Sequence, residues 1–85
     1  MSVGEVRVAV DAAVLMANDQ LNLITSALDV VSPLSAQVAA ALRGTSHPEA
    51  DVLVARLDEM TQGLQAALGA GSSAVAVGAL LLTEL

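Results

Sequence analysis

The chain is 85 residues long, 55% of them hydrophobic, and it contains no Cys, Phe, Trp or Tyr. One small domain is therefore expected, without disulfide bonds or thiolate metal ligands. Nine acidic residues against three arginines give a formal net charge of −6, which argues against binding to nucleic acid or to an anionic membrane surface.

The first half of the chain repeats apolar side chains at alternating steps of four and three residues, which predicts a long amphipathic helix with coiled-coil spacing. Polar residues recur on the opposite side, from Asp11 to Ser32. Pro33 predicts a kink, with a split into two helices as the alternative. The predicted seam of this first arm consists of Val3, Arg7, Val10, Val14, Ala17, Leu21, Ile24, Leu28, Val31, Ser35, Val38 and Leu42.

Helix stop and start signals follow each other closely in the middle of the chain. Gly44 is free to adopt the left-handed conformation that ends many helices. Ser46 and Glu49 have the spacing of a capping box, and Pro48 suits the first turn of a helix. We therefore expect a tight turn at residues 44–46 and antiparallel arms, in which the numbers of facing residues add up to about 90.

The second half repeats the same spacing, which predicts a second long helix. Glycines near Gly71 predict a bend or a short break in it. Together the two arms predict an all-α fold, a single antiparallel helical hairpin over residues 1–85. The predicted seam of the second arm consists of Ala50, Leu53, Leu57, Met60, Leu64, Ala67, Gly71, Ala74, Gly78, Leu81 and Leu85.

Large apolar side chains also lie outside both predicted seams, and a two-helix hairpin cannot cover them. A homo-oligomer is therefore expected, with a dimer that forms a four-helix bundle favoured, followed by a larger assembly or a helical protein partner. The alternative is a compact monomer of three or four short helices, formed by breaks at Pro33 or Gly71. The proposed interface residues are Met16, Leu23, Val30, Leu68, Val75 and Leu82.

The sequence offers no catalytic, cofactor-binding or metal-binding residues. The one histidine, His47, lies in the predicted turn without cysteines or other histidines, so a helix start explains it better than a metal site. Asp58 and Glu59 are adjacent and point in different directions on a helix. We therefore predict that the protein is not an enzyme and has no cofactor.

The length, the acidic charge and the central turn "RGTSHPEAD" resemble those of the WXG100 (ESX-type) proteins and other small actinobacterial helical-hairpin proteins. The sequence contains neither the Trp-x-Gly of the WXG100 turn nor a tyrosine, so no functional residue is transferred from that family. The resemblance implies dimerisation through helical hairpins and a role in binding.

The sequence thus predicts a non-enzymatic interaction or assembly protein that acts through its apolar helix faces. One alternative is a structural subunit of a phage or another large particle. Another is a small membrane-inserted protein that uses residues 60–83, although glycines and polar residues dilute that segment. The expected location is cytoplasmic, or outside the cell after export without a cleavable signal peptide.

Overall fold

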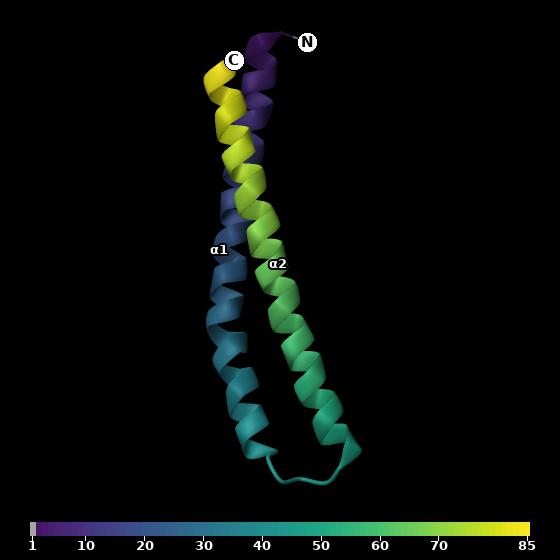
Figure 1. Cartoon of the computed structure of the whole chain (residues 1–85). Coiled ribbons are helices and arrows are strands. Elements are labelled where there is room, and N and C mark those ends of the chain that lie inside the picture. Colours follow the sequence, from purple (N-terminus) through teal and green to yellow (C-terminus); the bar gives the residue numbers. More distant parts are fainter. Residues whose placement is uncertain (1) are drawn as a thin grey trace.

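The computed structural model describes residues 2–85 as two long helices joined by a short connection. Helix α1 spans Val3–Ala41 and helix α2 spans Pro48–Glu84. They run antiparallel in a rod with extents of 63 × 17 × 15 Å, and both termini lie at the end opposite the connection (Figure 1). The predicted all-α hairpin is confirmed.

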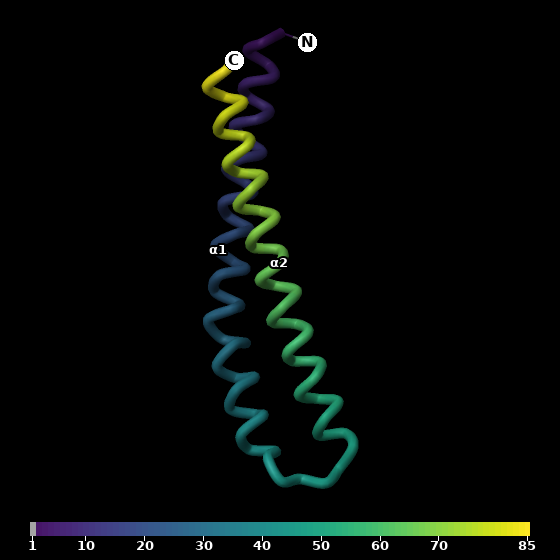
Figure 2. Tube along the Cα trace, viewed as in Figure 1, coloured from purple at the N-terminus to yellow at the C-terminus, as the bar shows by residue number. Residues whose placement is uncertain are grey.

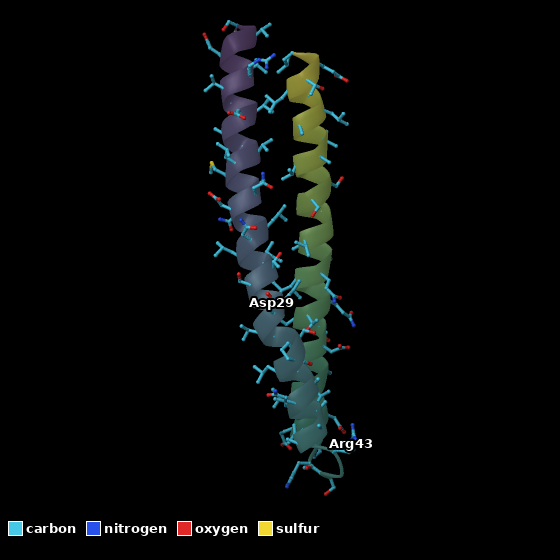
Figure 3. The ribbon with its side chains drawn as sticks, turned by 90° about the vertical axis from the view of Figure 1, so that its left-hand side faces the viewer. Asp29 and Arg43 are labelled. Atoms are coloured by element: carbon cyan, nitrogen blue, oxygen red, sulfur yellow. The ribbon has the colours of Figure 1, made fainter. Side chains whose placement is uncertain are left out.

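Both helices are continuous, although each contains residues that predicted an interruption. Pro33 lies inside α1 and removes the N–H that would bond to the carbonyl of Asp29. The helix changes direction just below the labelled Asp29 in Figure 3 but does not split. The short break expected near Gly71 is wrong, because the glycine is one residue of an uninterrupted α2. Its cost of about 1 kcal/mol relative to alanine is small beside the contacts of a long helix.

The helix ends show which capping predictions hold. Gly44 has a φ of 84°, the left-handed conformation expected after α1. The predicted capping box at Ser46 is wrong, since the N-cap of α2 is His47, which makes no side-chain cap hydrogen bond. Pro48 is the first helical residue, and a residue that precedes proline is held in the extended region that an N-cap adopts.

The N-terminus of α1 has a cap that the sequence did not single out. The side-chain oxygen of Ser2 accepts a hydrogen bond from the backbone N–H of Glu5 at 3.1 Å. This bond satisfies one of the free N–H groups of the first turn, and Glu5 adds negative charge at the positive end of the helix dipole.

The helices also wrap around one another along the rod. In Figure 1 they overlap near the termini and lie side by side near the connection. Figure 3, turned by 90°, shows the opposite arrangement. The tube in Figure 2 follows the same crossing without a break in either helix. Wrapping keeps a stripe with a 3.5-residue period facing the other helix, although a straight helix has 3.6 residues per turn.

Candidate interaction surface

The contact between the helices begins with a seam on α1 that the sequence predicted well. From Val10 to Leu42, every predicted seam position is half-buried. The first two predicted positions, Val3 and Arg7, are instead exposed near the open end, where Val6 is half-buried. The spacing of large side chains therefore identified the contact stripe of α1 over most of its length.

The seam of α2 differs from the prediction at every second position. Six of the eleven predicted residues are buried or half-buried as expected. They form one row, a set of positions seven residues apart, from Ala50 through Leu57 to Leu85. The other five predictions are wrong, because the structure leaves these residues exposed. They are Leu53, Met60, Ala67, Ala74 and Leu81. The half-buried residues that take their places are Val54, Thr61, Leu68, Val75 and Leu82.

Two glycines of α2 show the register directly. A Cβ atom built on Gly71 would lie 2.5 Å from Cδ2 of Leu21, and one built on Gly78 would lie 2.7 Å from Cγ2 of Val14. In both pairs the residue numbers add up to 92, and not to the expected 90. The two glycines therefore accept α1 side chains where any larger residue would collide.

One side of the seam carries a polar groove near the connection. The groove has a volume of about 460 Å³, and α1 contributes Ser32 and Ser35 to its lining. Helix α2 contributes Asp51, Asp58 and Thr61, and four apolar residues complete the lining, namely Ala36, Ala39, Val54 and Ala55. Residues seven positions apart lie on the same side of each helix, so further residues continue this side along the rod. We call the resulting surface the polar face, formed by Asp11, Asn18, Thr25, Ser32, Asp51, Asp58, Gln65 and Ser72.

The other side of the seam carries an apolar groove near the open end. The groove has a volume of about 290 Å³, and Ala13 of α1 and Ala74 of α2 form its two edges. Gly78, Ala17 and valines of the seam complete it, and no lining residue is polar. The row of Asp58 and the row of Ala74 therefore flank the seam on opposite sides of the hairpin.

The rows of Ala13 and Ala74 define a second, apolar face along the rod. Met16, Leu23 and Val30 border the Ala13 row, because residues three and four apart are neighbours on a helix. No charged residue occurs in these three rows within the described chain. The apolar face consists of Ala13, Met16, Gln20, Leu23, Ala27, Val30, Leu34, Leu53, Met60, Ala67, Ala74 and Leu81.

The structure divides the proposed interface residues into two groups. Met16, Leu23 and Val30 are exposed on the apolar face, with 63% or more of each side chain accessible. The other three, Leu68, Val75 and Leu82, are half-buried in the seam against α1. Four large residues of the apolar face were missing from the proposed set, namely Leu34, Leu53, Met60 and Leu81.

The hairpin encloses almost nothing by itself. Among residues 2–85 only Ala50 is buried, and no large side chain is fully covered. Figure 3 shows side chains projecting from the outer sides of both helices along the whole rod.

Polar chemistry is sparse in the described part of the chain. No group of three His, Asp or Glu side chains there is close enough to hold a metal ion. The single ion pair found between residues 2 and 85 joins Arg56 and Glu59 at 2.9 Å, and both side chains are well exposed. His47 is exposed at the start of α2. Among the described residues, seven of the thirteen exposed large hydrophobic side chains lie on the apolar face.

Comparison of the chain with protein-family models, with curated proteins and with solved structures found no match. Both helices are long and apolar enough to cross a membrane by length and composition, since their windows of 18 residues reach mean hydropathies of 1.3 in α1 and 1.7 in α2.

Proposed function

We propose that this protein is a non-enzymatic interaction and assembly protein, whose function is to bury its apolar face against another copy or against a helical partner. The observation that carries the proposal is the absence of an internal core. Only Ala50 is buried among the described residues, whereas large side chains such as Leu23 and Leu53 remain exposed. Burying each large side chain would contribute roughly 1.5–3 kcal/mol.

The accessible surface supports the same proposal. The chain exposes 5907 Å², whereas a compact folded monomer of 8.5 kDa would expose about 4,700 Å². The excess of roughly 1,200 Å² is larger than the area that one partner loses in a standard protein–protein interface, about 800 Å². A dimer in the form of a four-helix bundle, with coiled-coil packing, would remove this excess.

Light scattering of the purified chain at micromolar concentration tests the proposal. We expect a mass of at least twice the 8.5 kDa of one chain, or a stable complex with a helical protein that co-purifies. A stably helical chain that remains at 8.5 kDa without any partner would contradict the proposal.

Membrane insertion is the second candidate, and the hydropathy of both helices favours it. A hydrophobic span needs about 20 residues that are predominantly apolar, and each helix contains such a window. Against this candidate, the polar face carries Asp11, Asp51 and Asp58, and carboxylates that face lipid are costly. Recovery of the chain only in detergent would favour insertion, and recovery in aqueous buffer would exclude it.

A further inference from the structure

We infer that the polar groove, with its continuation to the turn, is a docking site for a helix of a different protein that carries two basic side chains seven residues apart. The site goes beyond the proposed function, because it lies on the side of the seam opposite the apolar face. The shape of the groove, the side chains that line it and the positions of the three arginines support it.

The polar groove continues as far as the turn. A second cavity of about 330 Å³ lies next to it, and both cavities are lined by Ala39, Asp51 and Val54. We call the two cavities together the turn groove. It follows α2 from Ala50 to Thr61, a length of about 16 Å or three helical turns. The turn groove is therefore long enough to hold a short helix between α1 and α2.

The apolar part of the lining consists mostly of small side chains. Ala50 belongs to it and is the one buried residue among those described. Small side chains on both helices leave the space between them unfilled, and they let a third helix approach each axis to about 8–10 Å. The remaining apolar residues of the lining are Ala36, Ala39, Leu42, Val54 and Ala55.

Two carboxylates line the α2 side of the turn groove. Asp51 and Asp58 are exposed and seven residues apart, which is about 10 Å along a helix. Asp58 accepts a hydrogen bond from Gln62 at 3.1 Å, and the one ion pair found among the described residues includes neither carboxylate. Basic side chains seven residues apart on a helix packed along α2 have the same spacing, so they can pair with both.

This chain does not supply such a helix. Its arginines are Arg7, Arg43 and Arg56, it has no lysine, and its one histidine is His47. No two of these residues are seven apart, so a helix from a second copy cannot neutralise both carboxylates. Arg43 lines the turn end of the groove and disfavours a basic residue there. The formal net charge of −6 attracts a basic partner over longer distances.

A synthetic helix tests the site. The probe is a fluorescently labelled, alanine-rich helical peptide with two arginines seven residues apart, added to the full chain. We expect saturable binding by fluorescence anisotropy, with a Kd that rises as salt is added, because salt screens exposed charges. The same peptide with glutamates in place of the arginines should not bind. Absence of saturable binding of the arginine peptide at low salt overturns the inference.

The carboxylates are tested by a charge-matched pair of double variants. Asp51→Asn with Asp58→Asn removes two charges from the turn groove but keeps a side-chain oxygen at each position, and it should raise the Kd about fivefold. Asp11→Asn with Asp19→Asn removes two exposed charges from the N-terminal half of α1 and should leave the Kd within about twofold. Equal losses would mean that overall charge alone attracts the peptide, which overturns the docking site.

The shape of the groove is tested without a change in charge. Ala39 lines both cavities and is half-buried. We expect Ala39→Phe to raise the Kd at least about tenfold, because the ring occupies the space that the third helix needs. Circular dichroism checks that this variant keeps its helices, and the asparagine variants provide the test if it does not. A helical Ala39→Phe variant that binds the peptide as well as the wild type overturns the inference.

The mass of the assembly separates this site from the proposed function. Asp51→Asn with Asp58→Asn should leave the mass by light scattering unchanged, because both residues lie opposite the apolar face. A change in mass would mean that the turn groove is part of the contact between copies, which overturns the docking site and leaves self-association standing. A wild-type chain that binds the peptide but remains at 8.5 kDa supports the docking site and contradicts self-association.

Discussion

The two faces of the hairpin are made by the same pair of helices and border the same seam, but they differ sharply in chemistry. The polar face presents Asp11, Asp51 and Asp58 together with hydroxyl and amide side chains. The apolar face presents leucines, methionines and alanines without a charged residue. A helix that only had to form a hairpin would need one apolar stripe, so the second apolar surface indicates a second neighbour.

The largest expected effect comes from placing a charge at the centre of the apolar face. Ala67→Glu would bury a carboxylate of each copy in an interface formed by the apolar face, and we expect it to weaken dimerisation by more than about hundredfold in Kd. Ala76→Glu places the same side chain on the row of Ala55, which lines the polar groove. Sedimentation equilibrium of both variants checks this, and equal losses would remove the distinction between the faces.

Smaller effects are expected at two glycines of α2, where alanine should change the free energy of unfolding in opposite directions. Gly69 has no atom within 4 Å of a Cβ built on it, whereas the Cβ of Gly78 would lie 2.7 Å from Cγ2 of Val14. Gly69→Ala should therefore raise the free energy of unfolding by about 1 kcal/mol. Gly78→Ala should lower it by about 1–2 kcal/mol, because the stiff valine in the seam cannot easily move away.

Urea denaturation at equal protein concentrations measures both glycine variants. A gain at both positions would show that the helices are not in close contact at Gly78. It would also contradict the register in which Gly78 faces Val14.

The smallest effect is expected outside both faces, at the N-cap of α1. Ser2→Ala removes the hydrogen bond from the N–H of Glu5 and should lower the free energy of unfolding by about 0.5–1 kcal/mol. The mass of the assembly should not change, because Ser2 lies on neither face. A change in oligomeric state would mean that the helix end takes part in assembly.

The sequence predicted the fold because its strongest signals are local. The stop at Gly44 and the start at Pro48 define the hairpin, and the stripe from Val10 to Leu42 contains large side chains at regular steps. In α2 the row of Leu57 has the row of Met60 on one side and the row of Leu68 on the other. Both flanking rows are apolar or small, so spacing alone could not decide which of them faces α1.

A signal for the correct register was present in the polar residues. When the row of Asp51 and Asp58 is placed on the same side of the seam as the row of Asp11 and Asn18, the row of Leu68 must face α1. That constraint requires the two arms to be considered together, since neither helix contains it alone. The Leu68, Val75 and Leu82 positions of the proposed interface depended on the register that was wrong.

The sequence also could not show that both helices are continuous. Helix propensities give the amount by which Pro33 and Gly71 each lower the stability of a helix. Whether the helix breaks depends on the contacts on either side, and Gly71 is held against Leu21 of α1. The glycine that predicted a break instead provides the space for a close contact between the helices.

The most direct test of the central claim, that the hairpin is stable only when its apolar face is covered, is the concentration dependence of thermal unfolding. If a second copy covers the face, unfolding is coupled to dissociation, and Tm must rise with protein concentration. We predict a rise of several degrees for each tenfold increase, retained in Ala76→Glu and lost with the helical signal in Ala67→Glu. A Tm that is independent of concentration, for a chain with a mass of 8.5 kDa, would contradict the account.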